Sequence, residues 1–124
     1  MTRTLLIHLA HLFYAISKVD GNLAFDEYTT LSESLKNRWH HLTDAQLEVV
    51  KNQFNTLQRN NISSKESFST FIEFAHQNPN LFTEELKTII LKTANDIAYA
   101  FAKINKSELN LMVNLSLEFK KLSI

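Results

Sequence analysis

One glycine, Gly21, and one proline, Pro79, are all that this 124-residue chain contains of the two residues that most often mark turns. A chain with so few of them has little provision for the hairpins of a β-sheet. Gly21 lies within AISKVDGNLAFDE, residues 15–27, between two segments whose apolar residues recur at helical spacing. Glycine often follows the last residue of a helix, because it enters the left-handed region without steric cost. The sequence therefore predicts an all-α fold with a helix ending near residue 19 or 20.

The length and composition predict a single domain over residues 1–124. A chain of this size buries roughly two-thirds of the surface that it exposes when unfolded, which is enough for a core without metal ions or disulfides. Hydrophobic residues make up 44% of the chain, and nine residues are Phe, so we expect an aromatic-rich core. The predicted architecture is a compact bundle of about six to seven helices.

Apolar periodicity places the main helices at about 4–19, 25–39, 44–57, 64–77, 84–101 and 106–122. Three starts carry capping signals. Thr43 has Gln46 three residues later, Ser63 has Glu66, and Thr83 precedes two acidic residues. Pro79 ends the fourth helix, because proline cannot continue one. The first helix is predicted to have a polar side that includes His8, His11 and Lys18.

The last predicted helix is apolar on nearly all sides. Its apolar residues are Leu109, Leu111, Met112, Val113, Leu115, Leu117 and Phe119. A helix that is apolar all round is buried inside a fold or covered by another chain. This pattern leaves two alternatives open, the central helix of the bundle or part of a dimer interface.

The chain matches itself when it is shifted by 81 residues. Ile16 then aligns with Ile97, Leu23 with Ile104, Glu27 with Glu108 and Leu31 with Met112. Each half reads as a helix, a short turn, a Glu in the next first turn and a second amphipathic helix. The match predicts two helical hairpins related by an approximate two-fold axis. The second copy lacks the acidic turn, since Asp20 aligns with Phe101 and Gly21 with Ala102.

The acidic turn is the main candidate for chemistry. Asp20, Gly21, Leu23 and Glu27 have the spacing of the second half of an EF-hand calcium loop. A complete loop is excluded, because Ile16 and Lys18 occupy the positions of its first two ligands. One alternative is a divalent cation (Ca²⁺ or Mg²⁺) held by two carboxylates. The other is a structural turn in which Gly21 ends one helix and Glu27 complements the N-terminus of the next.

The five histidines predict no strong metal site. His8 and His11 stand three residues apart on one helix, which suits a shared metal ion, but no carboxylate lies near them in that helix. We expect both to face solvent or a partner. His76 suits a helix C-terminus, where its charge is favourable. The sequence has no Gly-rich phosphate loop, GxSxG, HExxH or Cys, so we expect a protein that is not an enzyme.

Charge and cysteine content limit the partners and the compartment. Thirteen basic and thirteen acidic residues give a formal net charge of zero, which argues against nucleic acid as a partner. No segment has the roughly 18 apolar residues of a membrane span, so no membrane insertion is expected. His8 and His11 interrupt the apolar N-terminal stretch, which argues against a cleaved signal peptide. The absence of Cys fits a reducing compartment, and a cytoplasmic location is predicted.

An apolar helix that ends in Asp-Gly, with an apolar residue two positions later and a Glu in the next helix, resembles the tellurite-resistance TerB-like family. Here AISKVDGNLAFDE is similar to the first copy of that motif, and IAYAFAKINKSE to the second. The resemblance implies a helical bundle with pseudo-two-fold repeats and a role in metal or stress responses and in protein complexes. It also implies metal ligands at Asp20 and Glu27 in the first copy, but only at Glu108 in the second.

The leading functional hypothesis is a non-enzymatic TerB-like helical module that binds a protein partner and responds to a cation at Asp20 and Glu27. The alternative is a homodimeric structural protein without a metal site, with the helix at 106–122 as its interface. A third hypothesis is an enzyme that uses His8 and His11 together with a carboxylate from elsewhere in the fold.

Overall fold

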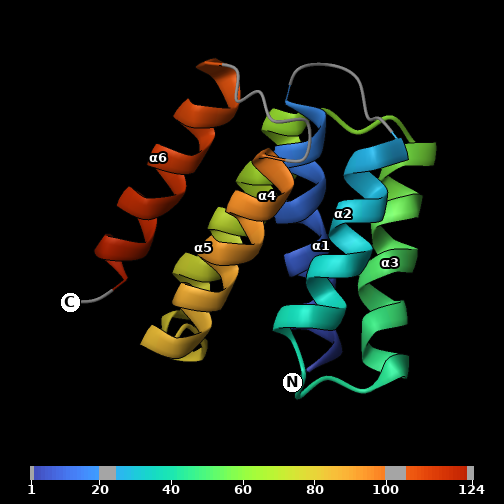
Figure 1. Cartoon of the computed structure of the whole chain (residues 1–124). Helices are drawn as coiled ribbons and strands as arrows, with labels where there is room; N and C mark the ends of the chain where they lie inside the picture. The colour runs from blue at the N-terminus through green and yellow to red at the C-terminus, as the bar shows by residue number, and fades with distance from the viewer. Residues whose placement is uncertain (1, 20–24, 100–105, 123–124) are drawn as a thin grey trace.

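The computed structural model describes residues 2–19, 25–99 and 106–122, and it describes residues 25–30 and 106–108 by their backbone alone. Within these residues the chain is helical and contains no strand, in agreement with the predicted all-α class (Figure 1). Its elements are α1 (Arg3–Lys18), α2 (Phe25–Arg38), α3 (Asp44–Arg59), α4 (Ser64–Gln77), η1 (Pro79–Leu81), α5 (Glu84–Ala98) and α6 (Lys106–Lys121). Predicted and observed helix ends agree to within three residues wherever both are described.

The helix starts follow the capping signals in the sequence. The Thr43 hydroxyl accepts a hydrogen bond from the Gln46 amide, and the Gln46 side chain accepts one from the Thr43 amide, which forms a complete capping box. The Ser63 and Thr83 hydroxyls cap α4 and α5 by accepting hydrogen bonds from the amides of Glu66 and Leu86. These side chains satisfy amide groups that have no partner inside the helix. The predicted starts of these three helices are confirmed.

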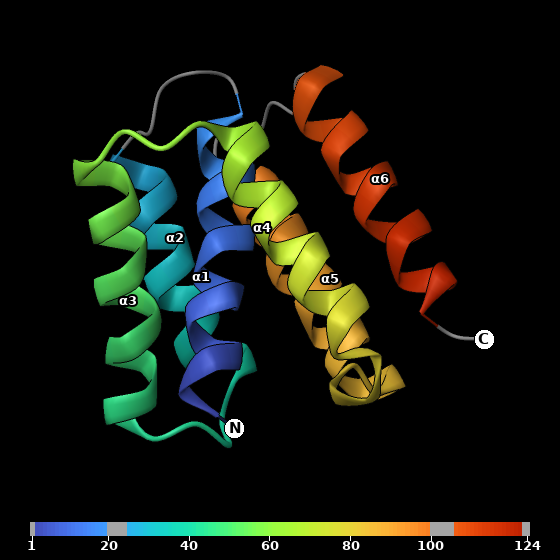
Figure 2. The same ribbon diagram turned by 180° about the vertical axis from the view of Figure 1, so that it is seen from behind.

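Helix α1 lies at the centre of the bundle, with α3 and α4 packed closely against it and with α2 and α5 also in contact (Figures 1 and 2). Ten of its sixteen residues are buried, and they extend over well more than half of the circumference of the helix. Small residues such as Ala10, Ala15 and Ser17 leave room for the neighbouring helices. The predicted polar side of α1 is therefore partly wrong, since His8 and His11 are half-buried.

Helix α6 is not the central helix. It lies at the outer edge of the molecule in both views and packs mainly against α5 (Figures 1 and 2). Only Met112, Leu115 and Phe119, which we call the inner row, are buried among its described side chains. The sequence left two alternatives for this helix, the central position in the bundle or a dimer interface. The central position is wrong for α6, because α1 occupies it.

The core is rich in aromatic residues, as predicted. Phe13 meets Trp39 edge to face with ring centroids 6.4 Å apart, and Tyr14 meets Phe54 at 5.6 Å. The Trp39 indole N–H donates to the Thr93 hydroxyl at 2.9 Å. In α4, Ser67, Phe71, Phe74 and Ala75 are buried, while Phe68 and Ile72 are only half-buried. Two neighbours, α1 and η1, cover a wider part of α4 than its apolar stripe indicates.

The helix starts repeat with the period of the internal match. Helix α5 begins 81 residues after α1, and α6 begins 81 residues after α2. The aligned pairs Ile16–Ile97 and Leu31–Met112 are buried. This spacing agrees with the predicted repeat, but the two-fold relation between the hairpins stays a prediction. None of the helices in the described ranges combines the length and apolar character that a membrane crossing requires.

Candidate functional site

The three predicted metal ligands lie outside what the structure describes. Asp20 falls in the segment 20–24, together with Gly21. Glu27 and Glu108 lie on the first turns of α2 and α6, but their side chains are not among those described. Elsewhere in the described chain, no group of three His, Cys, Asp or Glu side chains is arranged to hold a metal ion. The cation site at the acidic turn stays a prediction from the sequence.

His8 and His11 pack between α1 and α4. The rings stack with centroids 5.6 Å apart, and the His8 ring also stacks on Phe74 at 4.0 Å. Their Nδ1 atoms lie 2.7 and 2.9 Å from the carbonyl oxygens of Thr4 and Ile7. A carbonyl only accepts hydrogen bonds, so Nδ1 carries the proton in each ring. Burial lowers the pKa of His11 despite its bond to Ile7, which raises it. These contacts give the pair a packing role.

A hydrogen bond between His76 and Glu118 joins α4 to α6. His76 Nε2 lies 2.5 Å from a Glu118 carboxylate oxygen, and Lys121 reaches the other oxygen at 3.2 Å. The hydrogen bond from His76, reinforced by Lys121, holds the pKa of Glu118 below its usual value although burial acts to raise it. The sequence suggested a C-terminal position for His76 but not its partner, because the pair is 42 residues apart. This contact links the last turn of α4 to the C-terminal part of α6.

A second polar contact joins α2 to α5. Asp96 accepts hydrogen bonds from the Ser34 hydroxyl at 2.7 Å and from two guanidinium nitrogens of Arg38, at 2.5 and 3.1 Å. Burial raises the pKa of Asp96, but the bonds from Arg38 and Ser34 outweigh it, so the pKa lies below its ordinary value. The geometry is the bidentate arrangement that suits Arg and a carboxylate. The contact links positions of α2 and α5 that are far apart in the sequence.

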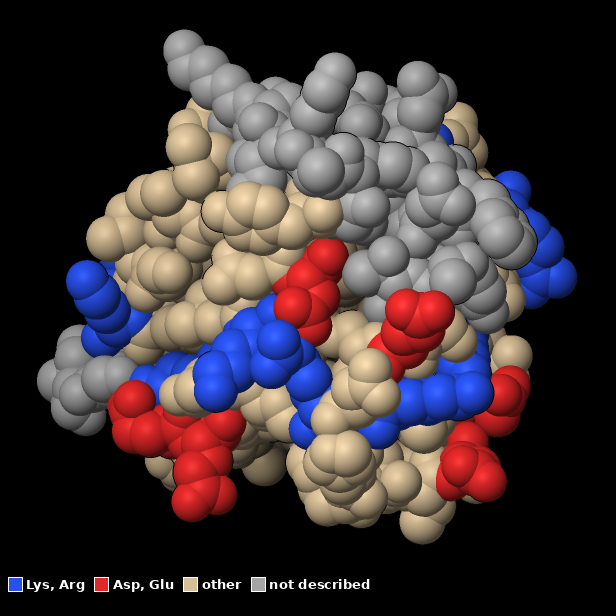
Figure 3. Space-filling model, viewed as in Figure 1, with Lys and Arg blue, Asp and Glu red and all other residues tan. Residues whose placement is uncertain are grey.

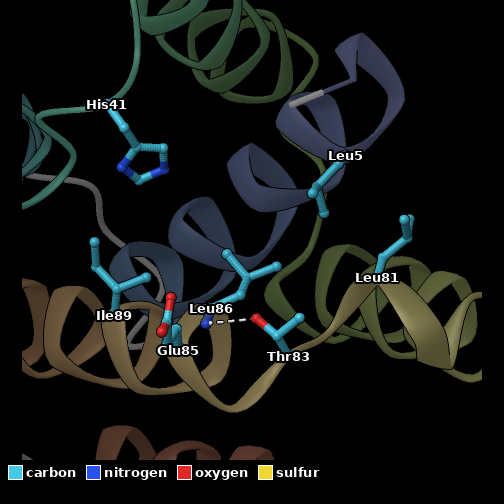
Figure 4. Close-up of a pocket in the computed structure, with 7 residues that line it drawn as sticks. All are labelled: Leu5, His41, Leu81, Thr83, Glu85, Leu86 and Ile89. Carbon is cyan, nitrogen blue, oxygen red and sulfur yellow. Dashed lines mark hydrogen bonds between the residues drawn. The ribbon is translucent and has the colours of Figure 1, made fainter.

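A hollow of about 470 Å³ opens beside the N-terminal turn of α5 (Figure 4). Leu5 of α1 and Leu86 and Ile89 of α5 supply apolar side chains, and His41 reaches it from the loop that follows α2. The Thr83 hydroxyl in its wall is used by the cap of α5, where it accepts from the Leu86 amide at 3.1 Å. The hollow is wide open, and its few polar groups do not converge on one point as those of a small-molecule site do.

Charges of both signs lie close together on the face of the molecule seen in Figure 3. Figure 3 shows Lys and Arg side chains in a band across the molecule, with Asp and Glu side chains above and below it. The salt bridges among the described residues include Arg38–Asp96, Lys87–Glu84 and Lys121–Glu118. On this face acidic side chains border the basic band, whereas a surface that tracks a phosphate backbone is basic throughout.

The outward side of α6 carries the most distinctive surface feature. Leu109, Val113 and Leu117, which we call the outer row, are 52%, 49% and 49% exposed. Residues four apart lie on the same side of a helix, so the three side chains form one stripe. The inner row faces the bundle, where Phe119 meets Phe71 and Phe82 at 6.3 and 6.0 Å. Helix α6 thus presents apolar side chains on two sides, of which the bundle covers one.

The outer row is the best candidate for a functional surface among the described residues. Exposed large hydrophobic residues are common singly, but a contiguous stripe of them marks a contact surface. The sequence already showed the apolar excess of this helix. It could not show which of its residues the bundle would leave exposed.

No protein-family model, curated protein or solved structure matches the chain.

Proposed function

We propose that this protein is a TerB-like helical module that acts by binding another protein, and that the outer row of α6 is the surface it uses. The observation that carries the proposal is the row itself, three apolar side chains each about half exposed on one outermost helix. Burying such side chains against a partner is worth about 25 cal/mol for every Å² of apolar surface removed from water. The resemblance to the family supplies the setting, a response to metal or chemical stress.

The position of α6 supports a binding role. Its buried inner row and the hydrogen bond between Glu118 and His76 attach it to the bundle, so the outer row is held on a formed helix before any partner binds. A surface that is already ordered loses little conformational entropy on binding. The whole segment 109–117, LNLMVNLSL, has no charged residue. Depletion of charge is typical of the buried centre of protein interfaces.

A matched pair of variants tests this proposal. The first, Leu109→Gln with Val113→Thr and Leu117→Gln, makes the outer row polar. The control, Asn110→Gln with Asn114→Gln, changes two exposed positions of α6 beside the outer row. We expect proteins from the native cell that co-purify with the wild type and the control in stoichiometric amounts to be lost from the first variant. Circular dichroism checks that both remain folded. Identical sets of bound proteins for all three would contradict the proposal.

The acidic turn gives the proposal a second part, in which a divalent cation at Asp20 and Glu27 modulates partner binding. Its support is the spacing of the two acidic residues around Gly21. Titration with Ca²⁺ or Mg²⁺, followed by calorimetry and amide NMR, is expected to give saturable shifts around Gly21 that Asp20→Asn removes. If no shift develops at millimolar metal, the structural-turn alternative holds and the cation has no part in the function.

A further inference from the structure

Helix α4 contacts α1 in two different ways along its length. In its N-terminal half, the hydroxyls of Ser64 and Ser67 donate to backbone carbonyl oxygens of α1 at 2.6 and 2.7 Å. In its C-terminal half, Phe74 stacks on the His8 ring with centroids 4.0 Å apart, and His8 stacks on His11 at 5.6 Å. Imidazoles titrate close to neutral pH, whereas hydroxyl groups do not. The two halves of α4 therefore differ in whether their contact with α1 contains a group that mild acid protonates.

We propose that the pair His8–His11 makes the C-terminal half of α4, residues 71–77, detach from α1 more readily in mildly acidic solution. Each ring donates its Nδ1 proton to a carbonyl oxygen of α1, so a further proton is added at Nε2. On His11 that proton places a positive charge between α1 and α4, on a half-buried side chain beside a second imidazole. Burial disfavours the charged form of a histidine, so acid favours the state in which this half of α4 has moved away.

The charged groups around His11 do not offset a positive charge on its ring. Burial is the largest cause of its lowered pKa, the hydrogen bond to the Ile7 carbonyl acts against it, and the nearby His8 lowers the pKa further. On α1 itself, Arg3 and Lys18 lie more than a turn from His11. The titratable side chains of α4 are all exposed, and none of them contributes to this shift: Lys65, Glu66, Glu73 and His76.

The lowered pKa of His11 sets the direction and the pH window of the effect. Once α4 has moved away, His11 regains its ordinary pKa of 6.5. The contact is therefore fully formed above pH 6.5 and weakens as the pH falls through the lower pKa of the packed state. The population of the detached state rises about tenfold for each unit between the two pKa values. This window lies above the one in which Glu118 titrates, since the ordinary pKa of that group is 4.5.

The C-terminal half of α4 also contacts α6, so its detachment reaches that helix. His76 is hydrogen-bonded to Glu118, and Phe71 meets Phe119 with ring centroids 6.3 Å apart. His76 is not the source of an acid-induced loosening, because its protonation would add a charge to a hydrogen bond with a carboxylate and strengthen it. The two histidine contacts of α4 therefore respond to acid with opposite sign.

Hydrogen exchange followed by NMR on the full-length chain measures the detachment. Rates are recorded from about pH 7.5 to about pH 5 and corrected for the intrinsic pH dependence of amide exchange. We expect the amides of residues 71–77 to lose protection as the pH falls, and those of residues 67–70 to change less. The carbon-bound ring protons of His11, followed in the same samples, are expected to titrate below pH 6.5, with the midpoint at which protection is lost.

Two variants assign the effect to its residue. His11→Gln removes the titrating ring and should make the protection of residues 71–77 independent of pH over this range. His40→Gln is the matched control, because it removes an exposed histidine from the segment after α2 and should keep the wild-type pH dependence. If His11→Gln lowers protection at every pH, the slope of its pH profile is still the deciding measurement.

Four results would overturn the inference. They are protection of residues 71–77 that does not change with pH, a loss that is equal in both halves of α4, a loss that persists in His11→Gln, and a His11 that titrates at or above pH 6.5. The outer row has no part in these measurements, so the proposed function is decided separately, by the proteins that bind the wild type and not the polar-row variant.

Discussion

Helices α1 and α6 are similar in sequence character and opposite in environment. Both carry apolar residues on nearly every side. Four helices contact α1, and its side chains from Leu5 to Ser17 are largely buried, whereas α6 packs mainly on α5 and exposes a full row of three apolar side chains. The comparison shows that a helix with apolar residues on all sides has to be covered, but its sequence does not say which helices or which chain will cover it. For α1 the cover is the bundle, and for α6 we propose that it is another chain.

The largest expected effect is at the centre of α1. Phe13 is fully buried and meets Trp39 edge to face. Phe13→Ala should lower the free energy of unfolding by about 3–5 kcal/mol, through lost burial and the cavity left behind. Urea denaturation measures it, with Phe13→Leu as a milder control. A loss below about 1 kcal/mol, a typical value for point mutations in general, would break the claim that α1 is the packed centre.

Two leucines of α6 allow its covered side to be compared with its exposed side. Leu115 of the inner row is 0% exposed, and Leu117 of the outer row is 49% exposed. We expect Leu115→Ala to cost at least about 2 kcal/mol in the free energy of unfolding. Leu117→Ala should change it by no more than about 0.5 kcal/mol at concentrations where the chain is monomeric. Equal losses for the two variants would mean that the bundle covers both sides of α6.

A smaller effect is expected where α4 attaches to α1. The buried Ser67 hydroxyl donates to the His11 carbonyl oxygen at 2.7 Å. Ser67→Ala removes this bond and should cost about 1 kcal/mol. Ser69, two residues along α4, is exposed, so Ser69→Ala is the matched control with little expected change. Thermal unfolding of both variants under one buffer measures the difference. A Ser67→Ala variant as stable as the control would show that the bond contributes nothing to the attachment.

The smallest expected effect concerns the hydrogen bond between His76 of α4 and Glu118 of α6. The pKa of Glu118 is lower in the folded protein than its ordinary value of 4.5, mainly because of His76. A carboxyl group with a lowered pKa stabilises the fold above its unfolded pKa, and that contribution is lost as the pH falls through the folded value. Because both side chains are partly exposed, we expect at most about 1 kcal/mol.

Glu118→Gln should therefore reduce the difference in the free energy of unfolding between neutral and acidic solution. Urea titrations of the wild type and the variant at several pH values on both sides of 4.5 would measure that difference. Hydrogen exchange of the α6 amides would show whether the loss is local to this helix. An unchanged pH profile in the variant would show that the hydrogen bond does not hold α6.

Much of the fold was predictable because its signals are local. Thr43, Ser63 and Thr83 cap the helices that they were expected to cap, since each needs only an amide two or three residues away. The pairs His76–Glu118 and Arg38–Asp96 were not predicted. Their members are 42 and 58 residues apart, and nothing in either segment specifies the other. The predicted ligands Asp20, Glu27 and Glu108 stay predictions.

The sequence alone determined where the helices begin and end, because caps, apolar spacing and the single proline act within a turn or two of chain. It also determined that the last helix has more apolar surface than one side of a bundle can cover. Only the tertiary structure decided that α1 is central, that the inner row of α6 is buried and that Leu109, Val113 and Leu117 remain exposed. Periodicity defines the direction of an apolar side chain relative to its own helix. Whether that side chain is buried depends on which other helices pack against that side.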